Sequence, residues 1–143
     1  MADADRALAL DFLRAWPAKI AHVSTLREDG TTTTVPVWYR ITDDDAMLIW
    51  TRHGRRWVRR LADSGHLSFS VAEVAFPMRG VMGAGPAVVL GDGDVDVDRE
   101  RAAIMCRYVL PFLVPAYEAA RTDHRAIIRV DLERLTGWSF EDA

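Results

Sequence analysis

The sequence is poor in the residues that crosslink a chain or bind a metal. It has a single cysteine, Cys106, so no disulfide can form within the chain. Its four histidines are scattered, and no spacing of Cys and His resembles a zinc site. We therefore expect no metal and a reducing, cytoplasmic location, with Cys106 as a buried structural thiol among apolar helix neighbours.

Long hydrophobic runs are also missing. A bilayer-spanning helix needs about 18 or more consecutive apolar residues, and the sequence has no such run. The first residues are polar and acidic and do not resemble a secretory leader. The sequence therefore predicts a soluble protein with no membrane partner.

Lysine is nearly absent, because Lys19 is the only lysine among 18 basic residues, and the formal net charge is −3. Against this balance, five arginines fall within nine positions: Arg52, Arg55, Arg56, Arg59 and Arg60. A basic cluster in an acidic chain indicates an anionic partner. The acidic pI of about 5.8 argues against nucleic acid as that partner.

Half of the 143 residues are hydrophobic, which is enough for the core of one domain, residues 1–143. Runs of β-branched and aromatic residues between turn residues predict six strands: Ile20–Leu26, Thr32–Ile41, Ala46–Thr51, His66–Ala72, Arg79–Leu90 and Ala126–Leu132. Helices are expected at Asp5–Trp16, Arg55–Ala62, Arg99–Val109, capped by Asp98, and Phe112–Arg121. Short acidic turns imply antiparallel neighbours. The expected fold class is mainly β, a barrel or sandwich with flanking helices.

The arginine cluster follows an apolar run and a Gly turn, at the expected start of a short amphipathic helix. Arg55 and Arg56 lie in its first turn, where positive charge opposes the helix dipole unless an anion is bound. Free backbone N–H groups and two guanidinium groups would together bind a phosphate. A solvated basic face is the alternative interpretation, and the position at a strand-to-helix junction favours the phosphate.

Two familiar motifs fail in this sequence. Gly83-Ala84-Gly85 begins like a dinucleotide fingerprint, but Val88 replaces the last glycine and strand-like residues flank both sides. Asp92, Asp94, Asp96 and Asp98 alternate as in a calcium loop, but the turn glycine and the final acid are missing. No serine or cysteine has the context of a nucleophile, so catalytic residues are unknown. A redox cofactor would bring its own reactive atoms.

Aromatic residues are spread along the expected strands and the arginine helix. Trp38, Trp57 and Trp138 are our candidates for lining a slot that accepts a flat heteroaromatic ring. Core packing is the alternative for each of them. His53, beside the arginine cluster, is either a phosphate ligand or an ordinary loop histidine.

The order of these segments resembles the FMN-binding split barrels related to pyridoxamine 5′-phosphate oxidase, which include enzymes dependent on the deazaflavin F-420. The similarity covers residues 15 to 140. It is carried by the strand and Asp-Gly turn of Ala21–Gly30, the Pro-Val-Trp-Tyr core of Val35–Tyr39, the phosphate segment Thr51–Leu61, the strand His66–Val71, and Val81–Val89 with Gly85 and Ala87. The resemblance implies a six-stranded antiparallel split barrel.

In the family's phosphate segment, Arg56 matches the conserved Arg, while Arg55 replaces a Ser and Trp57 replaces a Lys. The family forms homodimers with cofactor sites at the subunit interface, which implies that Met78, Arg79 and Trp138 belong to the partner's site. The cofactor-binding residues expected from the pattern and the resemblance are Val35, Pro36, Val37, Trp38, Trp50, Thr51, Arg55, Arg56, Trp57, Arg60, Met78, Arg79 and Trp138.

The resemblance implies an FMN-dependent oxidoreductase that moves a hydride or electrons between the flavin and a small organic substrate. Two alternatives remain open. One is a reductase that uses F-420, whose acidic tail would also contact Arg59 and Arg60. The other is a noncatalytic carrier of flavin or haem.

Overall fold

The computed structural model describes residues 3–110, 113, 115 and 125–139. Its helices are α1 (Asp3–Arg14), α2 (Arg56–Ser64) and α3 (Val97–Met105). Its strands are β1 (Ala21–Leu26), β2 (Thr32–Val37), β3 (Tyr39–Ile41), β4 (Ala46–Arg52), β5 (His66–Ala72), β6 (Arg79–Leu90), β7 (Arg125–Asp131) and β8 (Arg134–Ser139). The mainly β prediction is confirmed, and eight strands replace the expected six.

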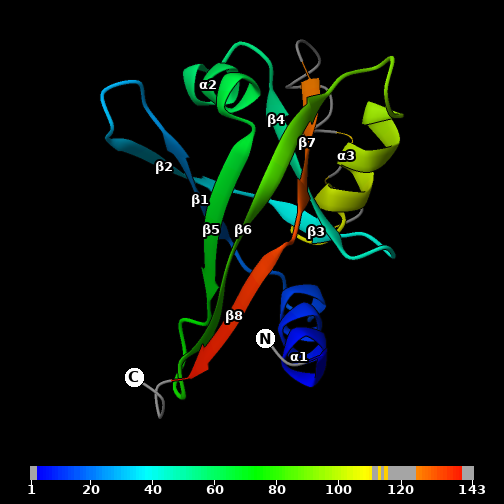
Figure 1. Cartoon of the computed structure of the whole chain (residues 1–143). Coiled ribbons are helices and arrows are strands. Elements are labelled where there is room, and N and C mark those ends of the chain that lie inside the picture. The colour runs from blue at the N-terminus through cyan, green and yellow to red at the C-terminus, as the bar shows by residue number, and fades with distance from the viewer. Residues whose placement is uncertain (1–2, 111–112, 114, 116–124, 140–143) are drawn as a thin grey trace.

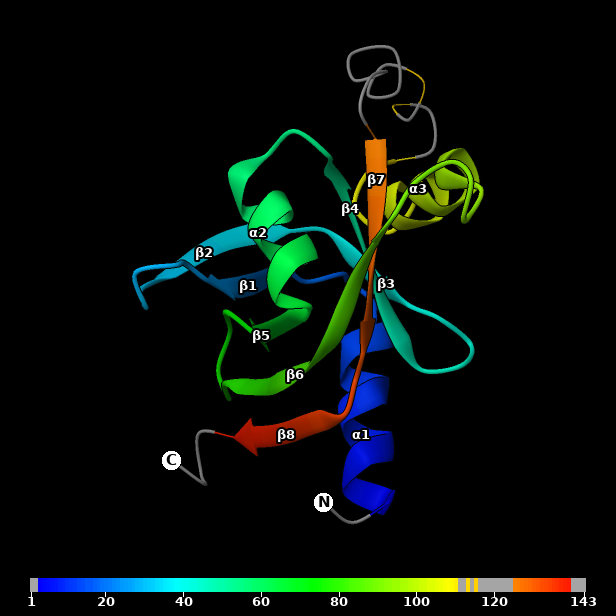
Figure 2. The same ribbon diagram turned by 45° about the horizontal axis from the view of Figure 1, so that its top comes forward.

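All eight strands form one antiparallel sheet in the order β2-β1-β5-β6-β7-β4-β3, with β8 paired to β6 outside this path. The long strand β6 joins the two halves: Gly80–Pro86 pair with β5, and Ala87–Leu90 pair with β7. Figures 1 and 2 show β6 running from the β5 side of the sheet toward β7 as the sheet curls. The curled, two-part sheet is a split barrel.

The two edge strands of this sheet, β2 and β3, are consecutive in sequence and only Trp38 separates them. The chain therefore crosses the open seam of the barrel at Trp38. The sequence predicted one continuous strand over Thr32–Ile41. This prediction was wrong, because the strand is interrupted at Trp38. Pro36, which cannot donate to a ladder, is tolerated because β2 is an edge strand.

The second difference is β8, which the sequence pattern did not predict. Its burial alternates only weakly, because Thr136 and Gly137 are exposed and Leu135 is its one buried residue. A strand with so few apolar residues carries little period-2 signal. Its hydrogen bonds to the first half of β6 hold it in place.

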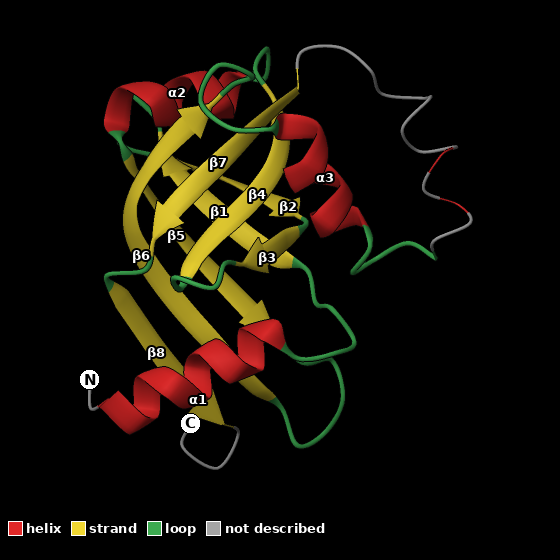
Figure 3. Ribbon diagram, turned by 90° about the vertical axis from the view of Figure 1, so that its right-hand side faces the viewer, coloured by secondary structure: helices red, strands yellow, loops and turns green. Residues whose placement is uncertain are grey.

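The helices lie at the ends and one side of the barrel. In Figure 1, α2 lies at the upper end, beside β5 and β6, and α1 lies at the lower end next to β8. Figure 3 shows α1 across this end and α3 beside β3 and β4. The buried face of α2 consists of Trp57, Val58 and Leu61, as its amphipathic pattern predicts. Among the described residues, no helix is long and apolar enough to cross a membrane.

Two expectations about α3 were wrong. The helix begins at Val97 and its cap is Asp96, whose carboxylate accepts the Arg99 N–H at 3.1 Å, in place of Asp98. Cys106 follows the helix and is exposed, because the buried face of α3 turns Ile104 and Met105 inward. Most of the expected helix Phe112–Arg121 lies outside the described residues.

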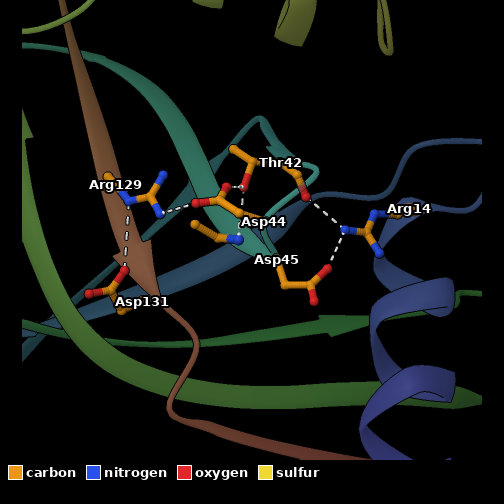
Figure 4. A network of polar contacts seen from close by, with 7 residues as sticks. Arg14, Thr42, Asp44, Asp45, Arg129 and Asp131 are labelled. Carbon is orange, nitrogen blue, oxygen red and sulfur yellow. Dashed lines mark hydrogen bonds and ion pairs between the residues drawn. The ribbon is translucent and has the colours of Figure 1, made fainter.

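The turn between β3 and β4 contains three consecutive aspartates, and cations from two distant elements stabilise it. Arg14 of α1 pairs with Asp45 at 2.6 Å, and Arg129 of β7 pairs with Asp44 at 2.7 Å (Figure 4). The hydroxyl of Thr42, followed by the guanidinium of Arg129, lowers the pKa of Asp44 to about 2. These pairs offset the repulsion among neighbouring carboxylates in a tight turn.

Tyr39 is the largest fully buried side chain of the core. Its hydroxyl donates a hydrogen bond to the carbonyl oxygen of Leu13 at 3.0 Å, which links β3 to the last turn of α1. Burial raises the pKa of Tyr39 from 10.0 to about 12. The phenol is therefore neutral in the fold at every pH at which the unfolded chain is also neutral.

Gly85 lies where β6 leaves its pairing with β5 and passes under the turn between β7 and β8. A Cβ atom at this position would come within 1.6 Å of the Asp131 carbonyl oxygen, which is backbone and cannot rotate away. The glycine therefore permits a close approach of two backbone segments.

We expect the substitution Gly85→Ala to lower the free energy of unfolding by at least about 3 kcal/mol, the upper range for overpacking a well-packed site. Gly137→Ala is the matched control, because nothing lies within 4 Å of a Cβ there, and it should change stability by less than about 0.5 kcal/mol. Urea unfolding of both variants measures the difference. Equal urea midpoints for the two variants would contradict this prediction, because they would show that the backbone at Asp131 moves away without loss of stability.

The raised pKa of Tyr39 predicts a loss of stability at alkaline pH. A group whose pKa is higher in the fold stabilises it fully below the unfolded value of 10.0, and this contribution disappears as pH rises toward about 12. We expect this loss to be roughly 3 kcal/mol, since it spans about two pKa units at about 1.4 kcal/mol each. The Tyr39→Phe variant should not show this alkaline loss of stability. At neutral pH it should be about 1 kcal/mol less stable than the wild type, because it lacks the hydrogen bond to Leu13. Urea unfolding across this pH range tests it, and parallel curves for the two proteins would contradict the assignment.

Candidate functional site

A pocket of about 520 Å³ opens at the seam of the barrel, between β2, β4 and the start of α2. Its size falls within the range of about 300–1,000 Å³ typical of sites for small molecules and cofactors. Its lining residues are Ile20, Val35, Pro36, Val37, Trp38, Trp50, Thr51, Arg52, Arg55 and Trp57. All of them except Ile20 and Arg52 are residues that the sequence analysis selected. The structure therefore brings most of the selected residues together around one opening.

The basic end of this pocket is the N-terminus of α2. Arg55 is the N-cap residue, and its side chain makes no capping hydrogen bond. The first turn has no acidic residue, so the positive end of the helix dipole and the guanidinium group act in the same direction. An anion at this position would be stabilised by both. The sequence predicted such a site with Arg55 and Arg56 both in the first turn, whereas in the structure Arg55 is the cap residue and Arg56 does not line the pocket.

The five clustered arginines do not all face the pocket. Arg52 and Arg55 line it, whereas Arg56 and Arg59 are exposed on α2 outside the lining. Arg60 points toward β2, where its Nη2 donates to the Thr33 hydroxyl at 3.0 Å. In the described part of the chain, no carboxylate lies within 4.0 Å of any of the five guanidinium groups.

The other arginine pairs show how unusual this is. Arg14, Arg40, Arg79, Arg125 and Arg129 each form an ion pair of 2.7 Å or less with an aspartate or glutamate. Among the described residues, the α2 cluster is therefore a patch of positive charge without ion-pair partners, in a chain of net charge −3. Mutual repulsion makes such a patch unfavourable until an anion approaches.

Three tryptophans, Trp38, Trp50 and Trp57, also line the pocket. Trp38 stacks on Tyr108, with ring centroids 4.9 Å apart and planes 4° apart, and it contacts Trp50 at 6.2 Å and 45°. Trp57 also lines the pocket, although it is only 7% exposed and packs on the main core. Trp57 therefore both lines the pocket and packs in the core.

Met78, Arg79 and Trp138 lie away from this pocket. Arg79 and Trp138 border a different hollow of about 580 Å³, between α1 and the strands β6 and β8. These elements are at the lower end of Figure 1, whereas α2 is at the upper end. Arg79 forms an ion pair with Glu73 at 2.6 Å. Within one chain, the structure does not bring these three residues to the seam, so Trp138 does not join Trp38 and Trp57.

Sequence reasoning missed Ile20, Arg52 and Tyr108 as residues at or behind the pocket. Arg52 belonged to the recognised arginine cluster, and its position at the end of a strand next to the helix could have indicated that it lines the pocket. Tyr108 carried no local signal. His53 is exposed and lies beside Gly91. The described residues contain no group of three or more His, Cys, Asp or Glu able to hold a metal ion.

The sequence matches no protein-family model and none of the curated proteins. The fold does have similar solved structures. A conserved hypothetical protein of Mycobacterium tuberculosis is similar over 97% of this chain and 85% of its own, with a TM-score of 0.72 and 19% identity. An FAD and heme binding protein of Mycobacterium smegmatis is similar over 94% of this chain and 70% of its own, with a TM-score of 0.71 and 18% identity.

An F420 reductase is also similar, over 88% of this chain and 94% of its own, with a TM-score of 0.64 and 19% identity. Flavin-binding proteins and an F420 reductase thus have the same arrangement of strands as this chain. At this level of identity the likeness establishes the fold. The chain has the split-barrel fold that its sequence resemblance implied.

Proposed function

We propose that this protein binds FMN in the seam pocket and acts as an oxidoreductase on a small organic substrate. The observation that carries the proposal is the pocket itself, which places an apolar, aromatic slot next to a helix N-terminus with unpaired arginines. A flavin mononucleotide has the matching chemistry, since a flat ring system is joined to a phosphate. FAD and heme binding by one protein of this fold supports a flavin-type ligand.

Each part of the pocket has a distinct task in this proposal. Arg55 and the first N–H groups of α2 hold the phosphate. Trp38, Trp57 and the backbone of Val35–Val37 enclose the ring and exclude water from it. The flavin supplies the redox chemistry when bound, so the chain needs no acid–base residue of its own for that step. Thr51, which is 7% exposed at the pocket wall, provides a hydroxyl near the ring.

F-420 is the second candidate, and one observation favours it. The positive charge continues beyond the pocket along α2, where Arg56 and Arg59 are exposed and no described carboxylate pairs with them. A single phosphate leaves this charge unused, whereas a coenzyme with an acidic tail would neutralise it. One protein of this fold is an F420 reductase. A carrier that binds flavin or haem without turnover is the remaining alternative.

A second copy of the chain is part of the proposal. Met78, Arg79 and Trp138 can act at a cofactor only if they reach the seam pocket of a partner subunit. The loop between β5 and β6, which contains Met78 and leads to Arg79, also carries Val74 and Phe76, which are 101% and 81% exposed. Such exposed apolar side chains are typical of surfaces that another protein covers, and a homodimer would cover them.

We expect Arg55→Ala to weaken FMN binding by about 1.5–3 kcal/mol, roughly 10- to 150-fold in dissociation constant, as for the loss of a charge-assisted hydrogen bond. Arg59→Ala is the matched control, because it removes an exposed arginine from the same helix outside the pocket. Isothermal titration calorimetry measures both variants. Equal losses would indicate a diffuse effect of charge and contradict an anchoring role for Arg55.

The same titration tests Arg56, which the family resemblance assigned to the phosphate. If Arg56 holds the phosphate, Arg56→Ala loses as much affinity as Arg55→Ala. If it is a solvated residue, as its exposure outside the pocket suggests, the affinity of Arg56→Ala stays near that of Arg59→Ala.

The absorption spectrum of the purified or reconstituted protein identifies the coenzyme. FMN absorbs in two bands in the near-ultraviolet and visible range, and the deazaflavin in essentially one. We expect the two-band spectrum, and reduction by a nicotinamide or deazaflavin donor separates an enzyme from a carrier. A protein that retains neither coenzyme after reconstitution would refute the proposed function.

A further inference from the structure

The segment that follows α3 contacts the aromatic wall of the pocket from behind. Tyr108 stacks on Trp38 with nearly parallel rings, 4.9 Å between centroids. Trp38 is the single residue between β2 and β3, and it has no register partner in either strand pairing. Its ring contacts with Tyr108 and Trp50 therefore contribute to the position of the indole ring.

Two hydrogen bonds fix the Tyr108 phenol. Its hydroxyl donates to the Lys19 carbonyl oxygen at 2.7 Å and accepts the backbone N–H of Tyr39 at 3.2 Å. Burial raises the pKa of Tyr108, so the phenol keeps the proton that the first bond requires. Ile20, next to Lys19, and Trp38, next to Tyr39, both line the pocket. One phenol thus joins the two backbone segments that meet at the seam.

The neighbouring Arg107 stabilises the same contact. Its guanidinium group donates to the carbonyl oxygens of Tyr39 and of Leu13, the latter at 2.9 Å, and lies over the Tyr39 ring at 4.7 Å. These bonds connect the chain after α3 to the end of α1 and the start of β3. The Arg107 guanidinium also lies 5.8 Å from the centroid of the Tyr108 ring, which stacks on Trp38.

We infer that Tyr108 is a positioning residue for the seam pocket: its ring holds the Trp38 indole in the orientation that forms the wall for a planar ligand ring. Tyr108 does not line the pocket and acts only through Trp38. The contact of Trp38 with Trp50 is tilted by 45° at 6.2 Å, so loss of the Tyr108 ring removes the parallel stack that holds the indole. The inference rests on the proposed function only for the identity of the ligand.

The test compares Tyr108→Leu, which removes the stacked ring, with Tyr108→Phe, which keeps it. Phe69→Leu is the control, because it removes a buried ring of the core that lines neither hollow. Near-ultraviolet circular dichroism of the cofactor-free protein reports the order of Trp38. Titration with FMN, and with F-420 in a parallel series, reports the pocket. Should Tyr108→Leu fail to fold, Tyr108→Met fills similar space without a ring and replaces it.

We expect Tyr108→Leu to weaken FMN binding about five- to tenfold, as for the loss of one stacked aromatic contact, and to reduce the tryptophan dichroism. Tyr108→Phe keeps the stacked ring and loses the hydroxyl bonds, so both of its losses should be smaller, within about threefold in affinity. Phe69→Leu should lower stability but leave affinity and the Trp38 signal unchanged. Unchanged dichroism and affinity in Tyr108→Leu, or equal losses in the Leu and Phe variants, would overturn the role of the stack.

The two readouts separate this inference from the proposed function. If the wild-type protein binds neither FMN nor F-420, the proposed function fails, and the dichroism of the cofactor-free variants still decides whether Tyr108 orders Trp38. If FMN binds and the Tyr108 variants bind it equally well, the proposed function stands and the positioning role fails.

Discussion

The structure depends on one strand that belongs to both halves of the sheet. β6 pairs with β5 and β8 along its first part and with β7 along its last part. This is only feasible because the backbone of β6 passes within contact distance of the Asp131 carbonyl, at a position where Gly85 carries no side chain. The bend at this point directs the two half-sheets apart and leaves the seam at which the pocket forms.

The seam is also where regular structure ends. β2 and β3 are the edge strands, and Trp38 between them stacks on Tyr108. The N-terminus of α2, with Arg55 as its cap residue, borders the same pocket. The pocket is at this place because the sheet does not close there.

Much of this arrangement was predictable from the sequence, and the exceptions have physical causes. The apolar face of α2 and the acidic turns gave strong local patterns, and the resemblance located Val35–Trp38. Tyr108 could not be found because its contact with Trp38 joins residues 70 positions apart in sequence. β8 lacked alternation, and the exposure of Cys106 depended on which side of α3 faces the sheet.

The unpaired arginines of α2 have a consequence for the kinetics of binding. Their charge adds to the positive end of the helix dipole, so the electrostatic potential at the pocket mouth is positive although the whole chain carries −3. Anions are therefore attracted over a distance of about one Debye length, roughly 8 Å at physiological ionic strength. An anionic coenzyme would be captured quickly in dilute buffer and more slowly as salt screens this attraction, while its ring contacts set how long it stays.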